Sequence, residues 1–373
     1  MRFCRVSDWL AWQEQLHPRA IDLGLDRLQS TLRALAWRRP SCPIITVGGT
    51  NGKGSTVALL TRILSESGYR VGTFSSPHLI RYNERIRIAE HEIDDVSLLV
   101  AFERIDAARG AQTLTFFEFN ALAALLVFET AGVDAIVLEV GMGGRLDAAN
   151  VVDADAAVIC SIALDHWEWL GNDVETIGAE KAGILRPGRP AILGARQMPN
   201  SIARIAEQLG AEVQQLGRDF DWQRETTGWS WRGRSHKYER LPPPALRGEI
   251  QLDNASASLA ALAELSKRLP VDKPAIERGL RTVNVPGRFQ VTKTVGSEIE
   301  WVLDVGHNPA AAHTLARSLN ESPRRTPTIA VFAALADKDV AGIVAQLAGC
   351  FGARVGSQLS GGRARGTAAL TER

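Results

Sequence analysis

Short runs of apolar residues alternate with amphipathic stretches along most of this chain. Four apolar runs have the length of strands: residues 44–47, 71–74, 135–140 and 156–162. Between them, apolar positions recur at helical spacing, as in residues 57–64 and 119–128. This alternation predicts an α/β fold with a parallel central sheet that helices cover on both faces. Loops after the strands then form one functional edge, where we expect Gly49, Ser76, Glu139 and Asp165.

The pattern changes in the second half of the chain. Residues 219–244 are polar and rich in tryptophan, which favours antiparallel hairpins, and residues 254–269 are helical again. Residues 283–288 are interpreted as a linker. A second alternating unit follows, with strands at 301–305 and 328–335 around a helix at 310–319. We therefore predict a larger domain over residues 1–287 and a smaller Rossmann-like domain over residues 288–373.

The tail over residues 351–373 is rich in glycine and arginine and has no apolar period. The C-terminal domain is therefore expected to be truncated, with a tail that resembles out-of-frame translation and supplies no strand from Phe351 onward. A disordered native tail is the alternative.

The segment Gly49-Thr50-Asn51-Gly52-Lys53-Gly54-Ser55 lies between the first predicted strand and the first predicted helix. Such a turn directs backbone N–H groups and the positive helix end toward one point, which suits phosphate oxygens. Lys53 adds a mobile cation, and Ser55 adds a hydroxyl suited to Mg²⁺. The loop departs from the common phosphate-loop pattern, because Val47 replaces its first glycine and Gly54 separates Lys53 from Ser55. A plain strand-to-helix turn is the alternative.

This loop variant resembles that of the amide-forming ligases of the Mur ligase superfamily. Further segments narrow the resemblance to the bacterial dihydrofolate synthase/folylpolyglutamate synthase family, whose order they keep. These segments are Ile21 to Leu25, Ser75 to Leu79, Tyr82 to Ile86, Leu114 to Glu118, Leu138 to Ala148, Leu164 to His166, Glu180 to Ile184, Pro286 to Phe289 and Asp304 to Pro309.

The resemblance implies an enzyme that uses ATP and two Mg²⁺ ions. It implies that Ser76 and Glu139 hold one ion, and that Glu139, His166 and a carbamylated Lys181 are associated with the second. A carbamate requires a neutral amine, which a desolvated site favours. Taken alone, Lys181 also fits a solvated helix lysine, and His166 fits a core or loop histidine.

The resemblance also assigns nucleotide and glutamate contacts. Asn254 matches a residue on the adenine side, Arg288 and Asp304 match residues that reach ATP from the hinge and the second domain, and His307 resembles a residue near the incoming glutamate. The loop residues that would hold the phosphates are Thr50, Asn51, Gly52, Lys53, Gly54 and Ser55. An ordinary strand-to-turn signal is the alternative for residues 304–309.

Three segments would recognise a pterin by the same resemblance. They are Asp22, Leu23, Gly24 and Leu25; Thr115, Phe116, Phe117 and Glu118; and Leu146, Asp147 and Ala148. Phe116 or Phe117 can stack on the ring, and Asp147 can accept hydrogen bonds from its N–H groups. Either phenylalanine can equally be part of the core.

Composition narrows the class of protein further. With 43 basic and 42 acidic residues the formal net charge is +1, which argues against a nucleic-acid or membrane-surface role based on bulk charge. The four cysteines form no CxxC pair and suggest neither a disulfide framework nor a structural zinc site. The N-terminus lacks a signal-peptide core, and no apolar run approaches membrane-spanning length. We expect a cytoplasmic monomer that binds small molecules.

The sequence therefore predicts an ATP-dependent ligase that adds L-glutamate to 7,8-dihydropteroate, and further glutamates to folates, through an acyl phosphate. Two alternatives remain open at this point. One is a different Mur-type ligase that acts on a cell-wall precursor, and the other is a truncated product that binds nucleotide with little turnover.

Overall fold

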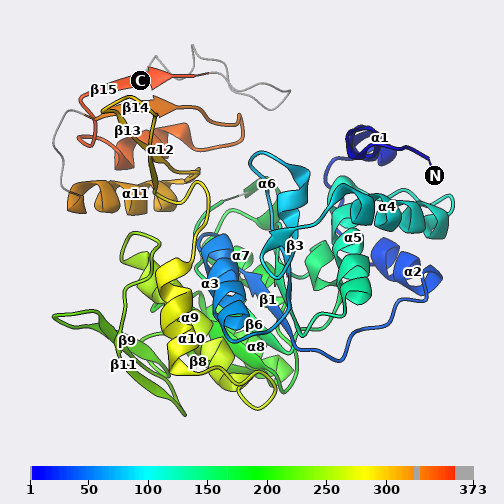
Figure 1. Cartoon of the computed structure of the whole chain (residues 1–373), viewed down its shortest axis with the longest axis horizontal. Coiled ribbons are helices and arrows are strands. Elements are labelled where there is room, and N and C mark those ends of the chain that lie inside the picture. Colours follow the sequence, from blue (N-terminus) through cyan, green and yellow to red (C-terminus); the bar gives the residue numbers. More distant parts are fainter. Residues whose placement is uncertain (1, 166, 323–327, 358–373) are drawn as a thin grey trace.

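An eight-stranded sheet forms the centre of the molecule in the computed structural model, which describes residues 2–165, 167–322 and 328–357 (Figure 1). The strand order is β4-β3-β2-β5-β1-β6-β7-β8, and all neighbours are parallel except β2–β3 and β3–β4. The strands are β1 (Ile44–Gly48), β2 (Val71–Phe74), β3 (Ile86–Ile88), β4 (His91–Glu92), β5 (Ala135–Glu139), β6 (Ala156–Ile159), β7 (Pro190–Leu193) and β8 (Glu212–Gln215).

All four strands predicted from apolar runs are present, and the α/β prediction is confirmed. One boundary is wrong: the predicted strand at 156–162 ends at Ile159, so Asp165 lies in the loop beyond it and not at the strand end. The remaining elements of this part are α1 (Val6–Leu16), α2 (Asp26–Ala34), α3 (Lys53–Glu66), η1 (Tyr82–Arg85), α4 (Asp95–Arg109), α5 (Phe116–Ala131), η2 (Ala148–Val151), α6 (Trp167–Leu170), α7 (Val174–Ala182), α8 (Asn200–Leu209), α9 (Ile250–Glu264) and α10 (Lys273–Thr282).

The central strands are buried on both faces, which explains why they read as continuous apolar runs. In β1, Ile45 and Val47 pack in one core with α3, α9 and α10, whereas Ile44 packs in a second core with α1, α2, α4 and α5. In β6, Val158 belongs to the first core and Ile159 to a third core with α7 and α8. Alternate residues of a strand point to opposite faces, so helices cover both sides of the sheet.

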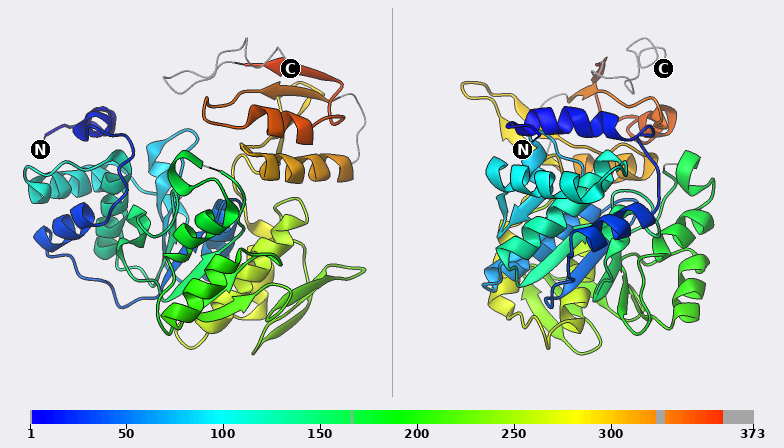
Figure 2. Two further views of the ribbon diagram at one scale, coloured as in Figure 1. Left: turned by 180° about the vertical axis from the view of Figure 1, so that it is seen from behind. Right: turned by 90° about the vertical axis from the view of Figure 1, so that its right-hand side faces the viewer.

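A three-stranded antiparallel sheet confirms the hairpins expected over residues 219–244. Its strands are β9 (Asp221–Arg224), β10 (Trp229–Arg232) and β11 (Lys237–Leu241). Trp229 and Trp231 are each 1% exposed and pack in the core that contains α9. The outer ends of these strands project from the molecule beside α9 (Figure 2).

The C-terminal unit lies over the ends of α3 and α9 (Figures 1 and 2). It contains the antiparallel pair β12 (Gln290–Lys293) and β13 (Glu300–Leu303), then α11 (Pro309–Glu321), β14 (Ile329–Phe332), α12 (Val340–Gln346) and β15 (Ala353–Gly356). β15 pairs in parallel with β14. The expectation that the tail supplies no strand from Phe351 onward is therefore wrong, because Val355 continues the sheet. Residues 358–373 of that tail lie outside the described residues.

Within the part of the chain that the structure describes, no helix combines the length and apolar character needed to cross a membrane.

Candidate active site

The loop between β1 and α3 carries the predicted phosphate-binding residues. Gly49 and Gly52 have φ angles of 137° and 91°, a region that favours glycine. A Cβ placed on Gly52 would lie 2.6 Å from Oδ1 of Asn254, so the adenine-side candidate lies directly against the loop. The N–H of Thr50 donates to the carbonyl of Ser161 at 2.6 Å. The loop after β6 thus helps to fix the bend before α3.

Glu139 lies beside the start of α3. It ends β5, is 4% exposed, and accepts a hydrogen bond at Oε2 from the N–H of Ser76 at 3.2 Å. A Cβ placed on Gly54 would lie 3.9 Å from both of its carboxylate oxygens. Burial raises the pKa of Glu139, while Lys53, the Ser76 N–H and Arg288 oppose that shift. A cation bound here would hold the carboxylate in its charged form.

Two lysines share one carbonyl of the loop. Nζ of Lys181 donates to the carbonyl of Gly49 at 3.0 Å, and Nζ of Lys53 donates to the same carbonyl at 3.1 Å. Lys181 is 4% exposed, so the solvated helix lysine is not the arrangement observed. Burial, followed by the charge of Lys53, lowers the pKa of Lys181 to about 7. A fraction of its amine is therefore neutral near neutral pH.

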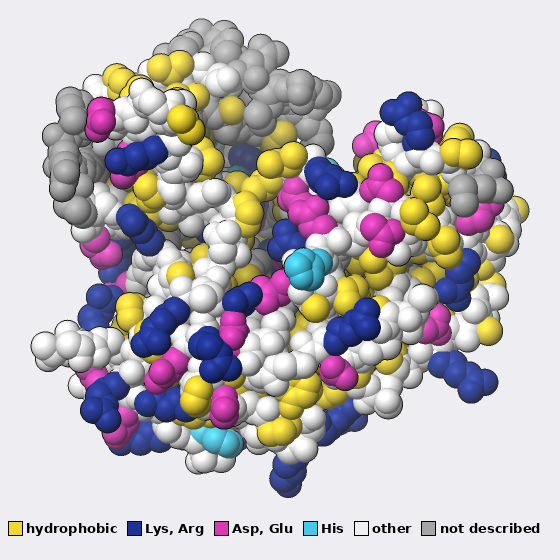
Figure 3. Space-filling model, viewed as in Figure 1, with side chains coloured by type: hydrophobic (Ala, Val, Ile, Leu, Met, Phe, Trp, Pro, Cys, Tyr) yellow, Lys and Arg dark blue, Asp and Glu magenta, His cyan; other side chains and the backbone are white. Residues whose placement is uncertain are grey.

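The C-terminal unit reaches the same loop through a polar contact. Asn308 exchanges amide hydrogen bonds with Asn51, at 3.0 and 3.2 Å, and donates to Asp165 at 3.2 Å. Lys338 pairs with Asp165 at 2.9 Å, and Nε2 of His307 lies 3.4 Å from Asp165. In the space-filling view, charged and histidine side chains gather at a hollow between this unit and the rest of the molecule (Figure 3).

Arg288 and Asp304 differ in their surroundings. Nη2 of Arg288 lies 3.9 Å from a Cβ placed on Gly54, which puts the guanidinium at the phosphate loop. Asp304 accepts the N–H of Phe289 at 2.9 Å and the N–H of Gly306 at 2.7 Å, so its carboxylate holds the hinge turn. Its predicted contact with ATP would have to use the remaining lone pairs.

The first pterin segment is tied to the second by Arg27, which the sequence analysis did not single out. Its Nη1 donates to Oδ2 of Asp22 at 2.8 Å, and its Nε donates to Oε1 of Glu118 at 3.0 Å. Glu118 also accepts the N–H of Thr115 at 2.7 Å and closes a capping box at the start of α5. Leu23, Gly24 and Leu25 lie between Asp22 and α2.

The two candidate stacking residues are half-buried at the start of α5. The ring of Phe117 lies 5.7 Å from that of Phe74, and a Cβ placed on Gly141 would lie 2.5 Å from its Cζ. The ring of Phe116 lies 6.1 Å from that of Tyr82. Phe117 is therefore packed against the sheet and the loop after β5, whereas Phe116 faces the segment around η1.

Asp147 is 2% exposed and caps the start of η2, between the half-buried Leu146 and the buried Ala148. Its oxygens accept the N–H of Met142 at 2.8 Å and the N–H of Ala149 at 2.9 Å. Burial raises its pKa to about 6, although these backbone N–H groups act against the rise. The carboxylate therefore shapes the loop after β5.

The structure brings Ser55, Ser76, Glu139, Lys181 and Arg288 to one edge of the sheet. His166 lies outside the described residues. Among the described residues no group of three His, Cys, Asp or Glu side chains gathers to hold a metal ion. Glu139 and the hydroxyl groups around the loop are nonetheless the hard oxygen donors that Mg²⁺ prefers.

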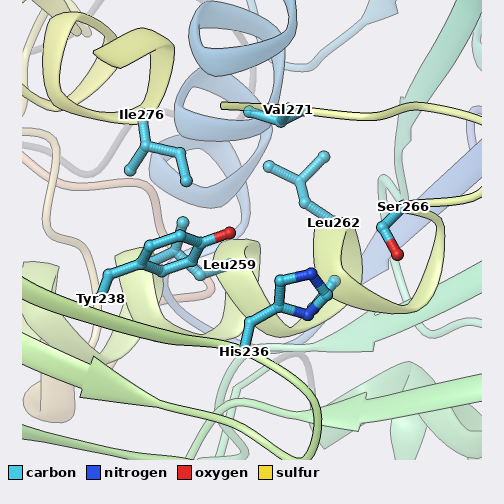
Figure 4. Close-up of a pocket in the computed structure, with 8 residues that line it drawn as sticks. His236, Tyr238, Leu259, Leu262, Ser266, Val271 and Ile276 are labelled. Atoms are coloured by element: carbon cyan, nitrogen blue, oxygen red, sulfur yellow. The ribbon is translucent and has the colours of Figure 1, made fainter. Parts of the chain in front are cut away.

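A small pocket between β11 and α9 lies apart from this edge (Figure 4). His236, Tyr238 and Leu259 are among its lining residues, and its volume of about 20 Å³ suits one water molecule. It is not a substrate site.

Each of the two parts of the chain matches a known protein domain. The sequence model of the Mur ligase middle domain matches residues 47–262, and that of the Mur ligase glutamate ligase domain matches residues 287–355. The chain belongs to the Mur ligase family. Curated relatives place it among the dihydrofolate synthases/folylpolyglutamate synthases, which are ATP-dependent, ADP-forming glutamate ligases.

Two of these relatives come from Escherichia coli (strain K12) and Haemophilus influenzae. The first is 42% identical over 342 residues, which cover 92% of this chain and 79% of the relative. The second is 40% identical over 359 residues, which cover 92% and 80%. The chain thus spans about four fifths of the length of these relatives.

Solved structures of this family show the same fold. E. coli FolC in complex with DHPP and ADP superposes with a TM-score of 0.93 at 40% identity, covering 99% of this chain and 87% of that one. The bifunctional enzyme from Yersinia pestis, complexed with AMPPNP and Mn ion, gives 0.91 at 41% identity, with the same coverage. The resemblance deduced from the motifs is confirmed. The expected loss of the family pattern from Phe351 is not borne out up to residue 355, because the glutamate ligase domain match extends to that residue.

Proposed function

We propose that this Mur-family ligase joins L-glutamate to 7,8-dihydropteroate and adds further glutamates to folates. The observation that best supports the proposal is the convergence of the phosphate loop with Glu139, Lys181 and Arg288 at one sheet edge. Family relatives support the substrates, since one bound DHPP and ADP and another bound Mn, AMPPNP and L-glutamate.

The chemistry follows from the weak electrophilicity of a carboxylate. A carboxylate oxygen attacks the γ-phosphorus of ATP, the bond to the bridging oxygen breaks, and ADP leaves. The glutamate amine then attacks the acyl carbon, and phosphate leaves. Lys53 and the N–H groups of Asn51 to Ser55 hold the phosphates, whereas the N–H of Thr50 is already bound to Ser161. Arg288 adds charge from the hinge, and Asn254 lies on the adenine side.

Mg²⁺ fits the donors at this edge, with Glu139, Ser76 and Ser55 as the proposed ligands. The bound ion would neutralise phosphate charge and polarise the phosphoryl group. We assign a second ion to Glu139, His166 and a carbamylated Lys181. The burial of Lys181 and its lowered pKa support the carbamate, because only the neutral amine reacts with carbon dioxide. Carbon-13 NMR of protein in labelled bicarbonate, compared with Lys181→Met, tests this assignment.

The remaining roles are proposals that rest on the family resemblance. The segments that include Asp22, Phe116 and Asp147 bind the pterin, and Asp304 and His307 serve ATP and glutamate. The domain boundary after residue 287, the cytoplasmic location and the monomeric state stay predictions from the sequence.

Phosphate release tests the proposed function directly. We expect release only when ATP, Mg²⁺, dihydropteroate and glutamate are all present, and none from Lys53→Ala under the same conditions. Replacing dihydropteroate by a cell-wall peptide precursor is the matched comparison. Release with the precursor alone would refute the folate assignment and favour a different Mur-type ligase.

A further inference from the structure

Arg85 is a buried cation with only part of its guanidinium hydrogen-bonded to the protein among the described residues. It ends η1 and is 8% exposed. Its Nε donates to Nδ1 of His78 at 2.7 Å. Among the described residues neither Nη group has a hydrogen-bond partner and no carboxylate lies within ion-pair distance of the guanidinium. Neither Nη atom is fully buried.

Glu84 and Glu139, whose charges act on Arg85, accept hydrogen bonds from other groups. Glu84 accepts the N–H groups of Leu79, Ile80 and Arg81, which closes the turn before η1. Glu139 accepts the N–H of Ser76 and lies at the phosphate loop. A guanidinium buried without an anion is costly, because burial removes its hydration. An anionic ligand is the partner that would offset this cost.

The position of Arg85 identifies which anion that is. Its guanidinium carbon lies 5.6 Å from the ring centre of Phe116, the half-buried candidate for stacking. Its backbone carbonyl accepts the N–H of Ser75, in the turn that places Ser76 against Glu139. Arg85 therefore lies between the predicted pterin segment and the predicted phosphoryl-transfer edge.

We propose that Arg85 binds the carboxylate of the pteroyl substrate, the group that is phosphorylated. The inference rests on the proposed function for the identity of the substrate. His78 holds Nε, which leaves the two Nη groups to donate to the two carboxylate oxygens in a fork. This contact holds one oxygen toward the γ-phosphorus, and it persists when the carboxylate becomes an acyl phosphate. Arg85 is thus a binding residue of the reacting centre.

The test compares 7,8-dihydropteroate with its carboxamide, which keeps the pterin and loses the charge. Affinities are measured by titration calorimetry of the full chain without ATP, so no turnover is needed. Arg85→Gln should weaken binding of dihydropteroate by about 10- to 150-fold, the range for a hydrogen bond to a charged group, and should bind the carboxamide like the wild type. Arg85→Lys should restore part of the difference. Arg81→Gln removes a charge from an exposed side chain of the same turn and should change neither affinity.

Equal losses for the acid and the amide would overturn the proposal, because Arg85 would then only support the pocket. Unchanged affinities would also overturn it. If Arg85→Gln melts before the assay temperature, the comparison uses Arg85→Lys, which must prefer the acid over the carboxamide less strongly than the wild type does. Failure of the wild type to release phosphate with dihydropteroate would refute the proposed function instead, since the calorimetric comparison does not depend on that activity.

Discussion

Replacing Lys181 by methionine should stabilise the fold while it abolishes ligase activity. Lys181 is 4% exposed, and the only hydrogen bond that its side-chain amine makes among the described residues is the one to the carbonyl of Gly49. Methionine keeps a similar length and volume without a charge. The variant therefore removes a desolvated amine and leaves little empty space.

The magnitude follows from the pKa. Burial, with the charge of Lys53, lowers the pKa of Lys181 from 10.5 to about 7. At about 1.4 kcal/mol per pKa unit, holding this lysine in the folded state costs roughly 4 kcal/mol at pH 7. Loss of the hydrogen bond to Gly49 offsets about 1 kcal/mol of the gain. Lys181→Met should then be more stable than the wild type by about 3 kcal/mol at pH 7.

The gain in stability from Lys181→Met should decrease as pH rises. The unfolded chain keeps the proton on Lys181 up to about pH 10.5, whereas the folded chain releases it near pH 7. Folding therefore expels a proton between these values, and wild-type stability rises with pH across that window. The advantage of the variant should fall to about 1 kcal/mol at pH 9 and vanish above pH 10.

Thermal melting at pH 7 and pH 9, in buffer free of bicarbonate so that no carbamate forms, measures both values. Lys273→Met is the control, because that side chain is 41% exposed and pairs only with Glu277 among the described residues. It should not shift the melting temperature. A Lys181→Met protein that melts below the wild type at pH 7, or an advantage independent of pH, would refute the reasoning.

Lys53→Ala should lower the rate of phosphate release by at least about two orders of magnitude while melting like the wild type, because the half-buried side chain begins α3 and, among the described residues, donates only to two loop carbonyls. Near-normal turnover would remove the phosphate-loop assignment. Lys181→Ala should lose activity and regain part of it when acetate or propionate is added, because their oxygens can replace those of a carbamate. No recovery at any carboxylate concentration would count against carbamylation of Lys181. Asp147→Ala should raise KM for dihydropteroate much more than KM for ATP. It should also cost about 1–3 kcal/mol of stability, because the N–H groups of Met142 and Ala149 lose their acceptor. Equal rises in both KM values would assign Asp147 to the fold. Asp155→Asn should destabilise the protein by about 3 kcal/mol near neutral pH, because the carboxylate is 3% exposed, accepts the N–H of Ile44 and pairs with three arginines. Burial would raise the pKa of Asp155, but these hydrogen-bond donors outweigh burial and hold the pKa below its usual value. The difference in stability between the wild type and Asp155→Asn should therefore shrink as pH falls below about 4 in acid titrations. A constant difference would contradict the assignment.

Local sequence determined the sheet and the loop that follows its first strand. The runs over residues 44–47 and 135–140 had to become β1 and β5, because strands buried on both faces leave no polar alternation. The turn in this loop requires positive φ angles at Gly49 and Gly52, which glycine adopts without strain. The capping residues Thr115 and Glu118 likewise fixed the start of α5. Each of these signals acts between residues that are close in the sequence, so the chain shows them directly.

Motif resemblance located most of the candidate site but not the hydrogen bonds and ion pairs within it. The family pattern marked Asp22, Asp147 and Asp304, yet it did not show that Asp147 and Asp304 accept backbone N–H groups. It also did not reveal that Arg27 joins Asp22 to Glu118. These contacts depend on how separate elements meet in space.

Tertiary structure alone decided burial, charge pairing and the contact between the two parts of the chain. Periodicity on a helix could not tell a solvated Lys181 from a buried one, because its surroundings come from the phosphate loop, far away in sequence. The tail had no apolar period, yet Val355 found a strand partner in β14 once the chain had folded back. Asn51 and Asn308 pair across the two parts for the same reason. The sequence by itself determined which backbone elements form, whereas the desolvation and partners that set the chemistry of Lys181 and Arg85 arise only when those elements pack together.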